Sequence, residues 1–326
     1  MSTNPSDTKT HPGSGDWVLL ATLTMLFGTS YAFIAVAVET IPPLTIVLVR
    51  LVIAGILLLI MAKIMGRKIP PILDLTGTFS RSWMFFVALA IVGNIVPFFL
   101  ISWGQQEVPS SLAGILVSVM PLATLAMAHF FVATDRMTPM RLLGFSIGMV
   151  GVIAHFGFSA LSDLGTVSPV HQLAVIGGAL CYAVNSVIVR FAPHNDAIMT
   201  SALVSVVAAL IVLPFTLLID QPWTIDPSTA STLAVVGLGI FPTALAGIVY
   251  FVLIKSAGPT FMSMVNYLIP WMAVIIGMVA LHERPPVTAF VALILIMVGV
   301  AISQYRGPRQ AQKLSPSGME QPDRKE

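Results

Sequence analysis

Arg50 is the charged residue that falls well inside an apolar stretch of this sequence. If the stretch is a helix that rises 1.5 Å per residue, the guanidinium lies roughly 10 Å from its nearer end. An ionised side chain at that depth in a membrane is a functional hypothesis by default. The alternative is structural, because a long arginine side chain can reach the headgroups or brace neighbouring carbonyls. The sequence favours the structural role slightly and leaves the functional one open.

Three amides and three tyrosines near the middle of other apolar stretches could bind a small solute. They are Tyr31, Asn94, Tyr182, Asn185, Asn266 and Tyr267. Polar groups that fix orientation, combined with rings that provide contact area, suit an uncharged or zwitterionic organic solute. The same amides could instead join helices through hydrogen bonds worth about 1 kcal/mol or less each. We predict these six residues as cavity residues, with the two interpretations balanced.

Acidic groups are absent from the middle of the apolar stretches; Glu39 and Glu107 lie at their ends. Proton-driven export of cations commonly uses a buried carboxylate, so this distribution argues against such a mechanism. His129 and His155 could titrate near neutral pH. A single histidine in a helix is more often a structural residue, and we expect both to be structural.

Catalytic and cofactor-binding motifs are also absent from the sequence. Glu283 follows His282 at an expected surface turn and lacks the spacing of a metal site. Glycine-lysine phosphate loops and hydrolytic triads do not occur either. We therefore expect no catalytic residue, no metal, no cofactor and no nucleic-acid partner.

The elements that carry these residues must lie in a membrane. Hydrophobic residues make up 56% of the chain and charged residues 9%, against about 25% charged in soluble domains. A membrane-spanning helix needs about 20 mostly apolar residues, and ten segments qualify. They are Trp17–Val38, Pro43–Met65, Trp83–Trp103, Ser110–Ala133, Met140–Phe158, Gln172–Phe191, Ala197–Ile219, Ser231–Ile254, Thr260–Leu281 and Pro286–Ser303.

The two ends of the chain differ from the rest in composition. Residues 1–15 and 307–326 are polar and rich in Pro, Ser and Gly, which predicts disorder. The first apolar segment is too long for the core of a signal peptide, so we expect it to be retained as a helix.

The lysines and arginines predict the orientation of the ten segments. With the N-terminus in the cytoplasm, fourteen basic residues fall on the cytoplasmic side, and Arg284 alone falls outside. Such a bias is what the positive-inside rule describes. We predict a multi-pass protein of the cell (inner) membrane with both termini cytoplasmic.

An internal duplication relates the two halves of the chain. The tetrapeptide Met149–Val152 recurs 148 positions later as Met297–Val300. Ten helices in two copies give five helices per copy, so the second copy enters the membrane from the opposite side. Inverted repeats of this kind build secondary transporters that expose a central site alternately to each side. The fold predicted is an all-α polytopic membrane protein with two inverted five-helix repeats, residues 16–158 and 172–305.

Helix-breaking residues interrupt corresponding helices of the two halves. The third and eighth helices contain Gly93, Asn94 and Pro97, and Gly239, Pro242 and Gly247; the fourth and ninth contain Pro121 and Pro270. Interrupted helices at matched positions are the best indication of a binding site in such repeats. A proline within a helix also leaves the carbonyl four residues earlier without its partner. We predict a cavity between helices 1, 3, 4, 6, 8 and 9, with Pro97, Pro121, Pro242 and Pro270 as helix breaks or gates.

Several short motifs, taken in order, resemble the EamA branch of the drug/metabolite transporters. They are Phe27–Ala35, Ile41–Leu44, Arg50 with Ala54 and Gly55, Pro121, Tyr267–Pro270 and Leu281–Arg284. One departure is Ala133–Arg136, where the family usually has a Gly-Glu-Arg-like turn. The resemblance covers residues 16–305 and implies a ten-helix transporter of small metabolites, often an exporter.

The function predicted is therefore secondary transport of a small metabolite or amino-acid-like solute by alternating access, with the lipid bilayer as surroundings. Export is the direction that the family resemblance implies. The alternative is a membrane-embedded sensor or enzyme that retains the fold. Gly144, Gly148 and Gly151 form a stripe of small residues on the fifth helix, which is typical of close helix packing. The sequence does not say whether that packing is internal or joins two protomers, so a homodimer stays open.

Overall fold

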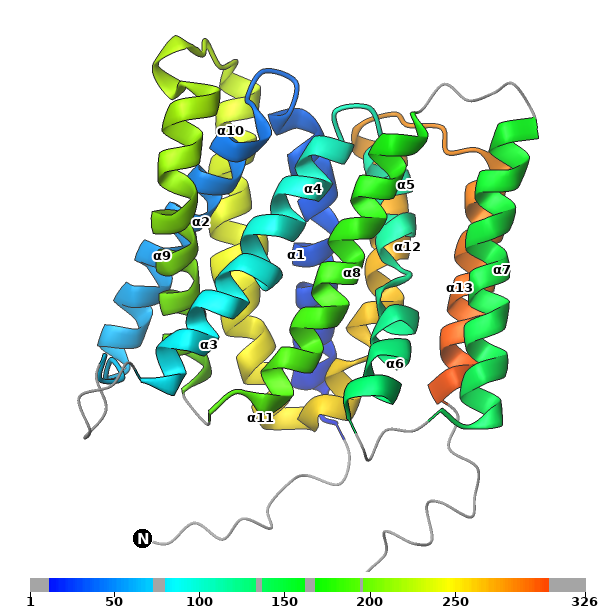
Figure 1. Ribbon diagram of the computed structural model, residues 1–326, viewed down its shortest axis with the longest axis horizontal. Coiled ribbons are helices and arrows are strands. Elements are labelled where there is room, and N and C mark those ends of the chain that lie inside the picture. Colours follow the sequence, from blue (N-terminus) through cyan, green and yellow to red (C-terminus); the bar gives the residue numbers. More distant parts are fainter. Residues whose placement is uncertain (1–11, 73–79, 133–136, 162–167, 194–195, 305–326) are drawn as a thin grey trace, which may run out of the picture.

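A computed structural model describes residues 12–72, 80–132, 137–161, 168–193 and 196–304. Within these ranges every regular element is a helix, so the predicted all-α class is confirmed (Figure 1). The first half contains α1 (Ser14–Ala37), α2 (Pro43–Ile64), α3 (Arg81–Leu89), η1 (Ala90–Ile95), α4 (Val96–Gly104), α5 (Ser110–Val117), α6 (Met120–Phe131) and α7 (Pro139–Leu161). The second contains α8 (Pro169–Phe191), α9 (Ala197–Phe215), η2 (Thr216–Asp220), η3 (Pro222–Thr224), α10 (Thr229–Leu238), η4 (Gly239–Leu245), α11 (Ala246–Met262), α12 (Val265–Ala280) and α13 (Val287–Gln304). Most of the two expected tails lies outside the described residues.

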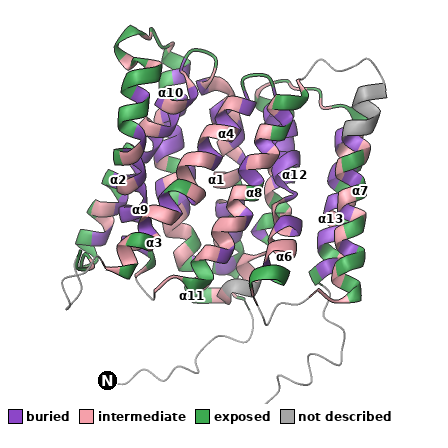
Figure 2. Cartoon of the chain, in the orientation of Figure 1, coloured by how far each residue is buried: buried purple, intermediate pink, exposed green. Residues whose placement is uncertain are grey.

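Eight helical stretches in the described ranges are long and apolar enough to cross a membrane. Two further apolar helices, Pro139–His155 and Val265–Ala280, are shorter. Large apolar side chains such as Ile64, Phe130 and Val287 lie exposed. Figure 2 shows exposed residues, in green, along the outer helices of the bundle. Exposed apolar surface of this extent marks contact with lipid. The chain is therefore a membrane protein.

Helices α7 and α13 lie side by side at one edge of the bundle (Figure 1). A Cβ added to Gly299 would contact the carbonyl oxygen of Gly144 and lie 2.7 Å from the backbone nitrogen of Gly148. A Cβ added to Gly151 would lie 3.1 Å from the carbonyl oxygen of Ala292. The glycine stripe therefore packs within one chain, backbone against backbone.

The third, fourth and eighth predicted helices depart from regular α-helical geometry near the residues predicted to interrupt them. The π-helical turn η1 contains Gly93 and Asn94, and the π-helical turn η4 contains Gly239 and Pro242. The next span is broken between α5 and α6, where Pro121 is the second residue of α6. Pro270 lies inside α12 without ending it. A π turn shifts the hydrogen-bond register of a helix and is frequent at functional sites.

Two carboxylates from the second half of the chain cap helices of the first half, and both of these helices begin at one end of the bundle. Asp220 accepts hydrogen bonds from the backbone nitrogen and hydroxyl of Thr45 at 2.8 and 2.9 Å. Glu283 accepts hydrogen bonds from the backbone nitrogens of Ser110 and Ser111 at 2.7 and 2.8 Å. Negative charge stabilises the N-terminus of a helix, where the N–H groups lack partners. These contacts tie each helix start to the opposite half of the chain.

Candidate functional site

A cavity of about 690 Å³ lies in the middle of the bundle. Its walls come from α1, η1 with α4, α5 with α6, α8, η4 with α11, and α12. These elements correspond to the helices from which the sequence predicted a cavity. Arg50 of α2 and Gln304 of α13 complete the lining.

Most of the predicted residues face this cavity. The lining includes Tyr31, Arg50, Asn94, Pro121, Tyr182, Asn185, Pro242, Asn266 and Pro270. Two predicted residues are not among those that line it. Pro97 is buried at the start of α4, and Tyr267 packs against Leu122, Ile296 and Val300.

Arg50 is 6% exposed and is held at two points. Its Nε donates a hydrogen bond to the hydroxyl of Thr243 at 2.7 Å. Its guanidinium carbon lies 3.7 Å from the centroid of the Phe98 ring, a cation–π contact. Thr243 in turn donates a hydrogen bond to the carbonyl oxygen of Leu238 at 2.7 Å. Because Thr243 belongs to η4, the π-helical turn positions the arginine.

A short line of rings and amides continues from Arg50 across the cavity. Phe98 meets Tyr182 edge to face, with ring centroids 6.5 Å apart. Asn185 follows Tyr182 by three residues, which places both side chains on one face of α8. A Cβ on Gly93 would lie 2.5 Å from Asn185 Oδ1, so the Asn185 side chain packs directly against η1 at this glycine.

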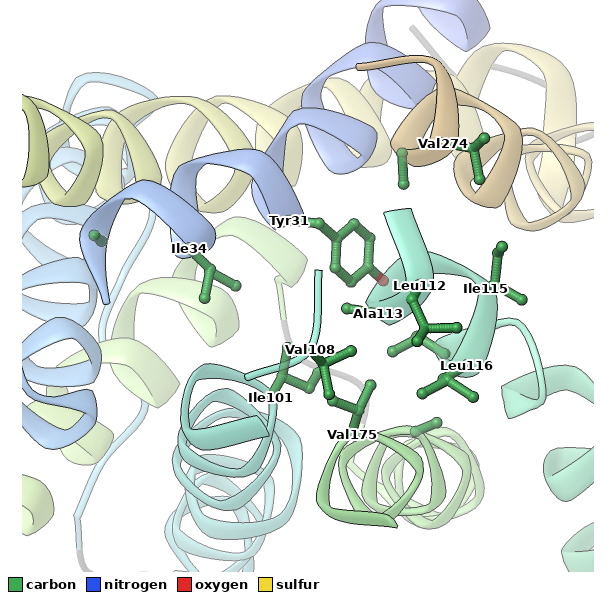
Figure 3. Packing of buried hydrophobic residues seen from close by; sticks show 14 of the residues in the cluster. Tyr31, Ile34, Ile101, Val108, Leu112, Ala113, Ile115, Leu116, Val175 and Val274 are labelled. Atoms are coloured by element: carbon green, nitrogen blue, oxygen red, sulfur yellow. The ribbon is translucent and has the colours of Figure 1, made fainter. Parts of the chain in front are cut away.

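The two ends of the cavity differ in packing. At one end a buried apolar cluster fills the space between helices, and Figure 3 shows Tyr31, Ile34, Ile101 and Leu112 as members of it. Gln105 Nε2 donates a hydrogen bond to the carbonyl oxygen of Tyr31 at 2.9 Å in the same region. We call this the closed end.

Toward the opposite end, the lining reaches the last residues of three helices. Arg190, Met262 and Gln304 lie near or at the C-terminal ends of α8, α11 and α13. Arg190 and Gln304 are exposed. The cavity thus opens where these helices end, and we call this the open end.

Comparison with known families decides the class of protein. The model of the EamA-like transporter family matches residues 15–156 and again residues 171–305. This chain belongs to the EamA-like transporter family. The resemblance seen in the sequence motifs is therefore confirmed.

Curated proteins that resemble the chain come from several bacteria. The uncharacterized inner membrane transporter YedA of Escherichia coli K12 is 28% identical over 258 residues, covering 79% of this chain and 80% of that protein. The uncharacterized transporter YvbV of Bacillus subtilis is 24% identical over 308 residues, covering 93% of this chain and 95% of that protein. A probable terminal-alkyne amino-acid exporter of Streptantibioticus cattleyicolor is 24% identical over 293 residues, covering 89% of this chain and 93% of that protein.

A protein of known crystal structure shares the fold. It superposes with a TM-score of 0.62 at 19% sequence identity, covering 89% of this chain and 97% of that chain. At this identity the likeness concerns the fold alone.

Several lining residues of this EamA-like protein were not predicted from the sequence. Phe98 and Thr243 hold Arg50, and Tyr250 also lines the cavity. Thr243 directly follows Pro242, so the predicted helix interruption was the signal that could have indicated it. Phe98 carries no such signal, because one phenylalanine among many in an apolar helix is unremarkable in the sequence.

The two histidines weighed in the sequence lie away from the cavity. His129 Nδ1 accepts a hydrogen bond from the backbone nitrogen of Met137 at 3.0 Å. His155 is buried in α7. The departure from the family pattern at Asp135 and Arg136 lies outside the described residues.

Proposed function

We propose that this protein is a secondary transporter that exports a small metabolite or amino-acid-like solute by alternating access. The observation that carries the proposal is the central cavity, which is walled by interrupted helices, closed at one end and open at the other. A cavity of about 690 Å³ falls within the usual size range of small-molecule sites. The relative described as a probable terminal-alkyne amino-acid exporter supports this choice of solute and direction.

Two inverted repeats of five helices would supply the second conformation. The contacts between α7 and α13 support this relation. When each residue is replaced by its equivalent 148 positions away in the other half, one contact between the two helices becomes the other. Gly151 approaches the carbonyl oxygen of Ala292, and Gly299 approaches that of Gly144, which is the equivalent of Ala292. As residue numbers rise along α7, those of the contacting residues fall along α13, so the two helices are antiparallel. Equivalent contacts between antiparallel helices are expected of a two-fold axis in the membrane plane.

The paired π-helical turns also support two repeats of five spans each. η1 and η4 fall in the middle of the third and eighth predicted spans. Counting the two shorter apolar helices as spans gives ten in total. On this topology the open end faces the cytoplasm, since Arg190 and Lys255 lie on that side.

Export can be tested in growing cells. Overproduction of the protein should raise resistance to toxic amino-acid analogues and lower their accumulation inside the cell. The matched control is an overproduced Gly299→Leu variant, whose α7–α13 contact has no room for a side chain. Equal accumulation with both proteins, across a broad panel of analogues, would refute export.

The orientation can be tested by cysteine labelling in a Cys181→Ser background. Cysteine at position 284 should react from the outside of intact cells, and cysteine at position 255 only after permeabilisation. Reaction of both positions from the same side would overturn the inverted topology.

A further inference from the structure

We propose that Arg50 binds a carboxylate of the transported solute, which makes the substrate class a small carboxylic acid such as an amino acid. The inference rests on the proposed function and deepens it by assigning a role to one buried charge. Arg50 lines the cavity and is 6% exposed. An arginine side chain stays protonated in proteins, so burial does not remove its charge.

Among the residues that the structure describes, none with an acidic side chain balances the charge of Arg50. The described residues that line the cavity include no Asp or Glu, and in the described part of the chain no carboxylate forms an ion pair with Arg50. A buried charge without a counter-ion is costly, and retaining one in a membrane usually has a functional reason. An anionic solute would supply the missing charge while it is bound.

The hydrogen bonds of Arg50 indicate which anion fits. A guanidinium has five N–H donors in one plane. Thr243 accepts the one from Nε, and Phe98 covers one face of the plane. The remaining donors are the two terminal NH₂ groups, which match the two oxygens of one carboxylate approaching end-on.

The surroundings favour a singly charged group over a phosphate. The lining residues that the structure describes include one other cation, Arg190, which is exposed near the open end of the cavity. A phosphate dianion that has lost its water shell would need a second buried cationic side chain beside Arg50. The aromatic side chains of Phe98, Tyr31 and Tyr182 provide contact area for the apolar part of an amino acid.

Arg50 is therefore the binding residue and Thr243 a positioning residue. Thr243 donates to the carbonyl of Leu238 within η4 and accepts from Arg50, so its hydroxyl fixes the angle of the guanidinium. Removing the hydroxyl should loosen that angle without removing the charge. A lysine at position 50 would keep the charge and lose the two parallel hydrogen bonds.

The test measures binding to purified full-length protein through the shift in its thermal unfolding midpoint. The probes are L-leucine, L-methionine, L-phenylalanine, their 2-keto acids and the primary amides of the three amino acids. At least one acid should stabilise the protein, and its amide should bind at least about tenfold more weakly, because a charge-assisted pair of hydrogen bonds is lost. A panel in which no acid binds better than its amide would overturn the proposal.

Variants separate binding from folding. Arg50→Lys should weaken binding of the acid by about tenfold or more and Thr243→Val by less, while neither changes the weaker binding of the amide. Arg81→Ala is the matched control, because Arg81 is exposed at the start of α3. The unfolding midpoint without probe reports whether each variant folds. If Arg50→Lys folds and binds the acid as tightly as the wild type, the assignment is wrong.

The proposed function can fail independently of this assignment. Saturable flux of acids and amides alike into liposomes would support the transporter function and contradict the role of Arg50. Acid-selective binding without any flux would keep the role of Arg50 and remove transport.

Discussion

Helices α7 and α13 touch backbone to backbone, whereas the spans that carry η1 and η4 leave a cavity between them. Both regions are rich in glycine, but the glycines act differently. On α7 and α13 they remove side chains so that two regular helices pack closely, which is how helices associate in lipid. In η1 and η4 they accompany Asn or Pro and a change of helical register. The edge is therefore close-packed and rigid, whereas the centre leaves room for a cavity lined by a few polar side chains among apolar ones.

Breaking the rigid edge should have the largest effect. Gly299→Ala places a methyl group against the carbonyl oxygen of Gly144 and 2.7 Å from the backbone nitrogen of Gly148. Backbone atoms of both helices would have to move, which we expect to cost about 3 kcal/mol. The measure is the yield and unfolding midpoint of purified protein. Gly247→Ala is the control, since nothing lies within 4 Å of its added Cβ; equal losses in both variants would contradict this account.

The same substitution in the centre should affect transport more than folding. Gly93→Ala brings a Cβ to 2.5 Å from Asn185 Oδ1, a side-chain atom that can move. We expect folded protein with a changed KM for the transported solute, because the displaced amide lines the cavity. Flux in liposomes and the unfolding midpoint, measured on one preparation, separate the two effects. A large loss of folded protein with unchanged KM would place Gly93 in the same class as Gly299.

One amide from each half of the chain faces the cavity, and removing either amide should change transport by a smaller amount. Asn94→Ala and Asn266→Ala should each alter KM by about threefold to tenfold, because each variant loses one hydrogen bond to the solute. The amount of folded protein should stay the same. Thr22→Ala on the exposed side of α1 is the control, because its hydroxyl bonds only to the carbonyl of Val18 within the described residues. Unchanged kinetics in both amide variants would assign them to helix packing.

The smallest effect on stability is expected at the start of α5, whose N-terminus is capped by a side chain from outside the helix. α5 has eight residues, and Glu283 accepts hydrogen bonds from the backbone nitrogens of Ser110 and Ser111 at its start. Glu283→Gln keeps the size and removes the charge, so the unfolding free energy should fall by about 1 kcal/mol. Arg284→Gln, at the exposed neighbour, is the control. An unfolding midpoint that falls no further for Glu283→Gln than for the control would show that α5 needs no cap.

The sequence predicted the interruptions because Gly, Pro and Asn have strong local effects on a helix. It predicted that the Gly144 stripe packs closely but not against what, since small residues suit any helix that approaches. Neighbours in a helix point about 100° apart, which explains why Asn266 lines the cavity while Tyr267 packs outside it. Choosing between them needs the rotation of the helix, which tertiary packing sets. Arg50 was ambiguous for a similar reason, because its partners Phe98 and Thr243 come from distant segments.

An alternating-access transporter carries its solute across the membrane through the central cavity. The most direct measurement is uptake of radiolabelled amino acids into liposomes containing the purified protein and preloaded with the same unlabelled amino acid. Alternating access predicts uptake that saturates with concentration and is faster when the liposomes are preloaded. Uptake across the amino-acid panel that matches empty liposomes, with or without preloading, would contradict the account.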